Sequence, residues 1–504
     1  MSAASSVLLV NPTITSARNA RFPLSVLALA AALRDEHDVT MLDGNVTRDT
    51  VPAALRLIDG ARFRAVGLTV MGGPQLAPAI ELSRAIRARH PALPIVWGGY
   101  FPTLYPQAAL NNDYVDFAIR GEGEHVLRSL LAALPDTGGA QLAAIPGLCF
   151  RDRERGDVHV TPSAKFGNAR KVGPLPYDLL GDPRRYLVRS FLGARTAAHQ
   201  ASVGCRFRCT FCGVAALFRG GTALPDAERL DADLRYLKHG LGADSIQYYD
   251  HNFFDREEDM VPLLEVMARH ELPWWCYARA DALLGLSAGS WKLVRRSGLR
   301  MAYIGAESPS DTMLRQIRKG TRADQTLAVA QLCRAQGVIP ELSFMVAPPH
   351  DPEGETQRTF DFIREIKKVN PQSEIIVYVY TPLPASAVPD GERRVPSMLH
   401  DVHGEPVVFP CSAEEWCKPQ WVEYACHADA PWVSERLRRH IRDFVTVLRC
   451  RFPTVQDTRS PAWVKLALRG LASWRYSLRR YDRPWELMAS QNLVRLLDPR
   501  VSSI

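Results

Sequence analysis

The chain lacks long apolar runs, a recognisable secretory signal and a strong excess of charge of one sign. None of its 504 residues lies in an uninterrupted apolar stretch that approaches the length needed to cross a bilayer. The first residues, MSAASSVLLVNP, lack a basic start and a cleavage site, so we expect a cytoplasmic protein. The 62 basic and 54 acidic side chains leave a formal net charge of +8. This modest excess suits anionic partners without requiring them, and we expect no nucleic acid partner.

Several common cofactor patterns are also missing. The N-terminal region has neither a Gly-x-Gly-x-x-Gly fingerprint nor a phosphate loop with Gly-Lys-Ser/Thr, so NAD and ATP are poorly supported. There is no repeat at solenoid spacing and no low-complexity tract. The composition, 46% apolar and 23% charged, is that of a folded enzyme, and the length favours two or three domains.

Residues 1–140 alternate short apolar runs with amphipathic helical segments. The runs SVLLVNP, DVTMLD, AVGLTV and PIVWGG are separated by helix-like stretches, which predicts a doubly wound α/β sheet with parallel strands. Ligands bind at the loops that follow the carboxyl ends of such strands. Those loops contain Asn11-Pro12, Asp43-Gly44-Asn45, Met71-Gly72-Gly73-Pro74 and Gly98-Gly99-Tyr100-Phe101-Pro102. Their glycines let the backbone approach a large flat ligand closely.

Three further regions follow this domain. Residues 141–195 are rich in proline, glycine and charge, and we expect a linker that packs on its neighbours. From 196 to 390 the strand and helix pattern returns, which predicts a partial or full barrel of parallel strands. Residues 391–504 become helical, aromatic and basic.

Three of the ten cysteines are clustered. The segment SVGCRFRCTFCGV places Cys205, Cys209 and Cys212 with three and then two residues between them. A loop of that length can hold three thiolates around a cubane cluster, and because ferredoxin-type clusters have four cysteine ligands, one iron would stay open. The alternatives are a zinc site with a fourth ligand from elsewhere, or unconnected buried thiols. Zinc sites usually show two cysteine pairs, and the second pair is missing here.

With Phe211 before the last cysteine, this spacing resembles the signature of the radical S-adenosylmethionine (SAM) superfamily. The resemblance implies a 4Fe-4S cluster whose open iron takes SAM, a deoxyadenosyl radical that abstracts hydrogen, and an electron donor such as flavodoxin or ferredoxin. It also implies SAM contacts near strand ends, at Phe211, Asp250, Asn252, Arg279, Glu307, Ser343 and Tyr378. Glu307 is the best candidate for an acceptor to the sugar or amine of SAM. The alternative makes the charged residues salt bridges at the barrel rim.

The first domain together with the cysteine segment resembles the cobalamin-binding (B12-dependent) class of radical SAM enzymes. The resemblance covers roughly residues 1 to 390 and rests on Val10–Pro12, Leu42-Asp43, Gly98–Thr103 and Ile119–Glu124. It implies a Rossmann-like cobalamin-binding domain, a partial (β/α)6 barrel of the TIM type, and a mainly helical C-terminal region. The cobalamin contacts that it implies are Asn11, Thr69, Met71, Gly72, Gly98, Gly99, Tyr100 and Glu122.

One motif of other cobalamin proteins is absent. Residues 1–140 contain no Asp-x-His-x-x-Gly, whose histidine ligates cobalt, and we expect His37, His90 and His125 to be surface or packing residues. The resemblance therefore implies cobalamin without a protein histidine below the metal. The alternative is a domain that holds no corrinoid.

Together these features imply a cobalamin-dependent radical SAM methyltransferase that acts on an unactivated carbon of a small molecule, a secondary metabolite or lipid-like substrate. The alternatives are an oxidative cyclase or ring-rearranging enzyme, as in the anaerobic chlorophyll-ring cyclases of the same class, and a non-catalytic cofactor-binding protein. We expect the substrate pocket between the two sheets, lined by Tyr100, Phe101, His251, Phe254, Tyr378 and Trp274 or Trp275.

The C-terminal region interleaves aromatic with basic residues: Trp463, Trp474, Tyr476, Tyr481 and Trp485 with Arg469, Arg475, Arg479, Arg480 and Arg483. This pattern is typical of an amphipathic helix that packs on the barrel with its arginines in solvent. The alternatives are a cover over the barrel mouth and a segment that rests on an anionic membrane surface. Nearby, Cys411, Cys417, Cys426 and His427 are irregularly spaced, so we expect isolated thiols rather than a second metal site.

Overall fold

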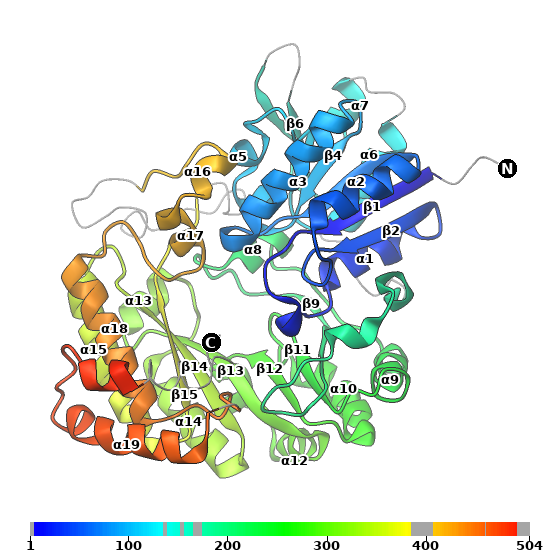
Figure 1. The fold of residues 1–504 in the computed structure, drawn as a ribbon. Coiled ribbons are helices and arrows are strands. Elements are labelled where there is room, and N and C mark those ends of the chain that lie inside the picture. The colour runs from blue at the N-terminus through cyan, green and yellow to red at the C-terminus, as the bar shows by residue number, and fades with distance from the viewer. Residues whose placement is uncertain are drawn as a thin grey trace.

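The structure is a computed structural model that describes residues 5–134, 139–151, 156–164, 174–384, 407–458 and 460–490. It consists of two α/β units, one above the other in Figure 1, and a helical C-terminal region along one side. No helix in the described residues is both long and apolar enough to span a membrane.

The N-terminal sheet has seven strands in the order β2-β1-β3-β4-β5-β6-β7. The first five are parallel and the last two are antiparallel. The strands are β1 Ser5–Asn11, β2 His37–Asp43, β3 Phe63–Thr69, β4 Ile95–Gly98, β5 Phe117–Ile119, β6 Leu148–Arg151 and β7 Val158–Val160. The helices are α1 Leu24–Leu33, α2 Thr50–Gly60, α3 Leu76–Arg89, α4 Tyr100–Leu104, α5 Pro106–Leu110, α6 Gly123–Ala133 and α7 Gly139–Ala143.

Alternate side chains of β1 show why this sheet is doubly wound. Val7 and Leu9 pack into one buried cluster with residues of α1 and α6, and Leu8 and Val10 pack into another with residues of α2 and α3. Since successive side chains of a strand point to opposite faces, the continuous apolar run SVLLV requires helices on both faces. The predicted doubly wound sheet is confirmed.

Part of the segment predicted as a linker is folded onto this sheet. Strands β6 and β7 form a hairpin within 141–195, and β6 pairs antiparallel with β5. Leu148, Cys149 and Phe150 are buried there. The apolar run of β6 is short and is surrounded by glycine, proline and charged residues, so its sequence does not indicate a strand. Its pairing with β5 depends on a free edge of the N-terminal sheet, which the local sequence does not show.

The second sheet has six strands, all parallel, in the order β15-β14-β13-β12-β11-β8. This is the predicted partial (β/α)6 barrel. Its strands are β8 Thr196–His199, β11 Ser245–Tyr248, β12 Trp274–Ala278, β13 Leu299–Glu307, β14 Ile339–Val346 and β15 Glu374–Val379. Its helices are α9 Ala227–Arg235, α10 Glu257–His270, α11 Ala280–Gly285, α12 Ala288–Ser297, α13 Asp311–Gln316, α14 Ala323–Gln336 and α15 Pro352–Val369.

The cysteine segment is an insertion between the first two barrel strands. It begins with β9 Val203–Gly204, which pairs antiparallel with β10 Thr222–Ala223, and contains α8 Gly213–Phe218. In Figure 1, α8 lies between the two units. The loop therefore reaches the N-terminal domain.

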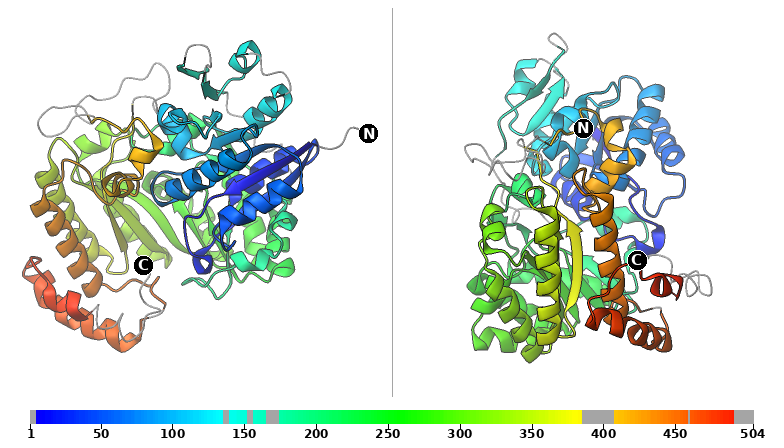
Figure 2. Two further views of the ribbon diagram at one scale, coloured as in Figure 1. Left: turned by 45° about the horizontal axis from the view of Figure 1, so that its top comes forward. Right: turned by 90° about the vertical axis from the view of Figure 1, so that its left-hand side faces the viewer.

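The C-terminal region is helical, as predicted, and contacts both units. Its helices are α16 Ala413–Trp416, α17 Pro419–Ala425, α18 Glu435–Arg451 and α19 Ala462–Ser477. Trp416 packs against Phe101 and Tyr105, and the hydroxyl of Tyr114 donates to Glu414 at 2.8 Å. Figure 2 shows α18 beside α15 of the barrel and α19 beyond it. His427 is hydrogen-bonded to Thr381, and the nearby cysteines are free thiols.

Candidate active site

A cavity of about 740 Å³ lies between the two sheets. One wall comes from α1 and from the loops that follow β3, β4 and β5, and the other from the cysteine segment and the carboxyl ends of β11, β12 and β13. The carboxyl ends of parallel strands are the usual ligand-binding edge of both fold types. Here both edges open into one space, so the ligands of the two domains would meet there.

Cys205, Cys209 and Cys212 all line this cavity. The backbone N–H of Cys212 donates to the carbonyl of Cys209 at 3.2 Å, and the N–H of Ala215 to the carbonyl of Cys212 at 3.1 Å, so the loop turns tightly into α8. All ten cysteines are described, and the other seven do not line the cavity. The site therefore offers three thiols without a fourth.

The chemistry of these thiols fits an iron-sulfur cluster better than a zinc ion. Burial raises the pKa of Cys205 and raises that of Cys212 to about 12, so thiolates there require a positive partner. No three His, Cys, Asp or Glu side chains in the described part of the chain lie close enough to share one metal ion. In a cubane each thiolate binds a different iron, so a wider arrangement of sulfurs is what the cluster needs.

Two residues that follow β11 hold the start of the cysteine segment. Asp250, which is fully buried, accepts hydrogen bonds from the backbone N–H groups of Ala201 (2.9 Å) and Ser202 and from the Ser202 hydroxyl (2.5 Å). Burial raises its pKa to about 6. His251 accepts a bond from the N–H of Gly204 at 3.2 Å, and burial lowers its pKa to about 4. Asp250 thus lies beneath the loop and does not line the cavity, whereas His251 does.

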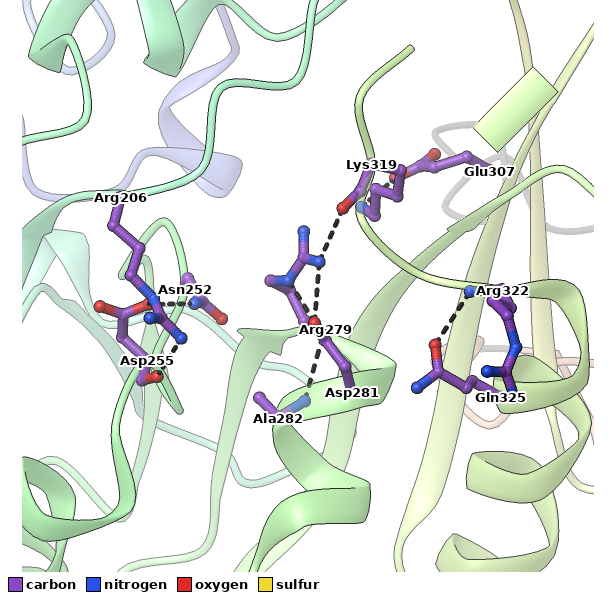
Figure 3. Close-up of polar contacts among 10 residues, drawn as sticks. All are labelled: Arg206, Asn252, Asp255, Arg279, Asp281, Ala282, Glu307, Lys319, Arg322 and Gln325. Atoms are coloured by element: carbon purple, nitrogen blue, oxygen red, sulfur yellow. Dashed lines mark hydrogen bonds and ion pairs between the residues drawn. The ribbon is translucent and has the colours of Figure 1, made fainter. Parts of the chain in front are cut away.

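Asn252 and Arg279 line the cavity next to the cysteines. Asn252 donates its amide N–H to Asp255 at 3.0 Å, and its buried Oδ1 has no hydrogen-bond partner among the described residues. An unpaired buried acceptor is rare in folded proteins, and here it fits an ammonium group such as that of SAM. The guanidinium of Arg279 lies 3.5 Å from the ring centre of Phe207. It also donates to the carboxylate of Asp281 at 3.0 Å (Figure 3).

Glu307 and Lys319 form a buried ion pair in the same wall. Oε1 of Glu307 lies 2.7 Å from Nζ of Lys319, and the carbonyl of Lys319 accepts a bond from Arg279 at 2.7 Å (Figure 3). Glu307 ends β13 with a φ of 63°, at a shift in register against β14. Burial would lower the pKa of Lys319, but Glu307 and Cys209 outweigh burial and raise it. The lysine is therefore charged.

Five glycines expose backbone in the N-terminal wall. Gly67, Gly98, Gly99, Gly121 and Gly123 line it, and Gly99 has a φ of 98° that favours glycine. A Cβ on Gly98 would have no atom closer than 4.0 Å. Exposed backbone of this kind fits a flat macrocycle such as cobalamin. No histidine from the described part of the N-terminal domain lines the cavity, and His90 is bonded to Asp59 at 3.0 Å.

The sequence-predicted residues divide into two groups. The cavity brings together Phe211, Asn252, Arg279, Glu307, Thr69, Met71, Gly98, Gly99, Tyr100 and Glu122. It leaves out Asp250, Ser343, Tyr378, Asn11 and Gly72. Asn11 is bonded to Asp43 and Gln75, and Tyr378 accepts from Tyr303 at 3.4 Å.

The predicted substrate pocket is only partly reproduced. Tyr100 and His251 line the cavity, but Phe101, Phe254, Trp274 and Trp275 are buried elsewhere and do not. Phe254 packs on Trp274 with ring centres 6.1 Å apart. These large apolar side chains fill the core of their own layers, which a sequence pattern does not distinguish from a pocket wall.

Several cavity residues were missed from the sequence. Lys319 comes from the segment after α13, where no periodic pattern marks a functional position. The only signal was indirect, because a carboxylate buried at a strand end requires a cation. Glu124 lies beside the predicted Glu122 in the Gly-Glu-Gly-Glu run, and both line the cavity. The tyrosines Tyr249, Tyr277 and Tyr303 also line it.

Comparison with protein families gives two matches. Residues 11–131 match the B12 binding domain, and residues 200–363 match the radical SAM superfamily. All the residues that line the cavity fall within these two ranges.

Curated relatives are similar over most of their length. An uncharacterised methyltransferase of Pyrococcus horikoshii is 25% identical over 348 residues, which cover 68% of this chain and 73% of the relative. The anaerobic magnesium-protoporphyrin IX monomethyl ester cyclase of a Synechocystis species is 25% identical over 367 residues, 71% of this chain and 70% of the cyclase. The hopanoid C-3 methylase of Methylococcus capsulatus is 24% identical over 371 residues, 72% of this chain and 67% of the methylase.

Solved structures share the fold. The radical SAM methyltransferase TsrM from Kitasatospora setae, solved with cobalamin and a [4Fe-4S] cluster, aligns with a TM-score of 0.64 and 18% identity over 99% of this chain and all of TsrM. The cobalamin-dependent SAM radical enzyme OxsB with aqua-cobalamin aligns with a TM-score of 0.60 and 22% identity. That alignment covers 71% of this chain and about half of OxsB, 52%.

Proposed function

We propose that this chain, which belongs to the cobalamin-binding class of radical SAM enzymes, transfers a methyl group to an unactivated carbon of a bulky apolar small molecule. The observation that carries the proposal is the single cavity shared by the carboxyl edges of both sheets. When bound, the cluster with SAM supplies a deoxyadenosyl radical, and cobalamin supplies the methyl group. The residues suited to hold these groups lie on opposite walls of one space.

The protein's own residues would bind, orient and exclude water. Cys205, Cys209 and Cys212 would hold the cluster, and Asn252, Arg279 and Glu307 would bind SAM, the last with Lys319 as its counter-ion. The backbone of Gly98 and Gly99, with Thr69, Met71, Tyr100 and Glu122, would support the corrinoid. A site between two domains limits the access of solvent to a radical and so reduces side reactions.

The remaining lining supports the substrate class. Between the cofactor residues the cavity is lined by Leu24, Leu29, Leu127, Val203, Val214 and Phe218. Such apolar walls with few polar groups suit a secondary metabolite or a lipid-like substrate. Two of the relatives are named hopanoid methylases, which favours the lipid-like substrate.

Product analysis after anaerobic reconstitution tests the proposal. We expect reduced protein with cobalamin and methyl-labelled SAM to yield both S-adenosylhomocysteine and deoxyadenosine, and to show the corrinoid by its absorbance. The label should appear in the product once a substrate is supplied. Reconstituted protein that binds no corrinoid would contradict the methyl-transfer half of the proposal.

A cyclase is the second candidate, favoured by the similarity to the anaerobic magnesium-protoporphyrin IX monomethyl ester cyclases. A cyclase needs only deoxyadenosine as a co-product, so an absence of S-adenosylhomocysteine would favour it. A third candidate, a non-catalytic cofactor-binding protein, requires that dithionite-reduced protein fail to cleave SAM.

We also propose a cytoplasmic location and a flavodoxin or ferredoxin as the electron donor. Ten free thiols favour a reducing compartment, and a cluster of this kind needs an external one-electron donor. Reduction of the reconstituted cluster by flavodoxin, followed in its absorbance, tests the donor.

A further inference from the structure

Helix α19 carries an apolar face that no described residue covers. Large apolar side chains of α19 are exposed by 44 to 70%, namely Trp463, Leu466, Leu471, Trp474 and Leu478 just beyond its end. Trp485 and Met488, which follow, are also exposed. The other exposed large apolar residues in the described part of the chain are scattered singly. Exposed apolar residues gathered in one segment mark an interaction surface.

These side chains form a continuous face. Trp463 and Trp474 are eleven residues apart, which is close to three helical turns. Leu466 and Leu471 lie between them at helical spacing, and Leu478 follows Trp474 by about one turn. The opposite face, with Val464, Ala472 and Arg475, is the buried one. Arg475 lies inside, bonded to Glu486 at 2.9 Å. The sequence pattern favoured aromatic residues inside and arginines in solvent, and for Trp463, Trp474 and Arg475 the structure shows the reverse.

Basic residues are frequent in the segment that carries this face. Residues 461–490 contain six basic and two acidic side chains, and one of the acids is paired with the buried Arg475. Arg469, Arg480 and Arg483 are exposed. The segment therefore combines exposed tryptophan and leucine with net positive charge, which is complementary to an anionic lipid surface.

The helix is too short to cross a bilayer but long enough to lie along one. Its 16 residues span about 24 Å. In Figures 1 and 2 it lies at the outer edge of the molecule, beyond α18, where a flat surface can reach it. Tryptophan prefers the level of the lipid headgroups, and each nearby arginine adds attraction to anionic lipid.

We propose that α19 is a peripheral membrane anchor that places Trp463 and Trp474 in an anionic lipid surface. The anchor is separate from the cavity, so this proposal does not depend on which reaction takes place in the cavity. It goes beyond the proposed function, because it assigns the chain a place on a membrane.

Flotation of the full-length, cluster-reconstituted protein with lipid vesicles tests the anchor. We expect binding to vesicles that contain phosphatidylglycerol and weaker binding to pure phosphatidylcholine. W463S/W474S should lower the partition coefficient at least about tenfold, since two interfacial tryptophans are lost. R469Q/R480Q should weaken binding to the anionic vesicles alone, as should added salt.

The matched control is I14S/V408S. Ile14 and Val408 are also exposed but lie outside α19, so this variant should bind vesicles like the wild type. Vesicle binding that W463S/W474S leaves unchanged, or no binding to either vesicle, would overturn the proposal. A dimer in light scattering that W463S/W474S converts to a monomer would also overturn it, because the face would then join two copies of the chain.

Discussion

Nζ of Lys319 lies 2.7 Å from Oε1 of Glu307, and both side chains are only 8% exposed in the cavity wall. The pair joins the end of β13 to the segment that follows α13. Each charge offsets the desolvation cost of the other, because either one alone would be a buried charge without a partner. Gly305 is required for the fit, since a Cβ there would collide with both charged groups.

Removing Lys319 should therefore lower the free energy of unfolding by more than the loss of one ion pair, because Glu307 stays buried without a counter-ion. We expect K319M to lower the free energy of unfolding by about 3–5 kcal/mol and to weaken SAM binding, because Glu307 is left as a buried unpaired carboxylate. K319M/E307Q should recover much of the stability but not the SAM affinity. Urea unfolding and calorimetric titration with SAM measure the two effects.

A surface ion pair provides the control. Arg322 and Asp324 lie 2.5 Å apart, but their side chains are 67% and 64% exposed. R322M should change the free energy of unfolding far less than K319M does, since water screens exposed pairs. The changes in the free energy of unfolding of K319M and E307Q should not add up to that of the double variant. If they do add up, the buried pair is not coupled.

Asp250 should control how well the cysteine segment holds its cluster. Its carboxylate accepts three hydrogen bonds from Ala201 and Ser202, each of a kind that contributes about 1.5–3 kcal/mol. We expect D250A to retain several-fold less iron and sulfide after reconstitution than the wild type, and D250N, which keeps one acceptor oxygen, to fall between them. Iron analysis and the electron paramagnetic resonance signal of the reduced cluster are the measurements. E258A, an exposed change early in α10, is the control, and equal iron in D250A would refute the role.

The sequence was informative where local pattern and function coincide. The cysteine spacing and the glycines after β4 could be predicted, because cluster ligation and close backbone approach each require particular residues at particular positions. Two sets of parallel strands predicted two ligand-binding edges. That the edges share a cavity follows from the packing of α8 against Tyr100, whose ring would lie only 2.8 Å from a Cβ on Gly213.

Positions that depend on register or on distant partners could not be predicted. Ser343 is near a strand end in sequence, but it is buried within β14 beside Gly305 of β13. Lys319 has no local signal at all, because its role comes from a carboxylate twelve residues away. The arginines expected in solvent are exposed apart from Arg475, but Trp463 and Trp474 are exposed as well, since the helix period does not show which aromatic residues find a partner to pack on.

Gly98 should be essential for the corrinoid but not for the cluster. A side chain there would enter the cavity, since the nearest atom to its Cβ would be the Cβ of Ile119 at 4.0 Å and the backbone needs no positive φ. We expect G98L to fold and to cleave SAM, but to bind cobalamin at least about tenfold more weakly, because the leucine fills the wall that a flat ligand requires. Absorbance titration with hydroxocobalamin measures the affinity. G60L, at the end of α2 with open space around its Cβ, should bind like the wild type. Full cobalamin affinity in G98L would place the corrinoid elsewhere.

Glu124 should make stability fall with rising pH. Burial, with a smaller contribution from Glu122, raises its pKa from 4.5 to about 7. In the unfolded chain the carboxyl loses its proton near pH 4.5, whereas in the folded protein it keeps the proton to about pH 7. The folded state therefore binds more protons between these values, and the free energy of unfolding decreases as the pH rises through this range.

Glutamine at this position is neutral at every pH and removes that loss. We expect the free energy of unfolding of E124Q, relative to the wild type, to rise by about 2 kcal/mol between pH 5 and pH 8, less than the full shift of the pKa because the carboxyl lines a solvent-accessible cavity. Urea unfolding at several pH values measures the difference. E122Q removes the second cause of the shift, so the pH-dependent loss should shrink while Glu124 is kept. A wild type and an E124Q variant with parallel pH profiles would mean that Glu124 is already ionised in the folded protein at pH 5.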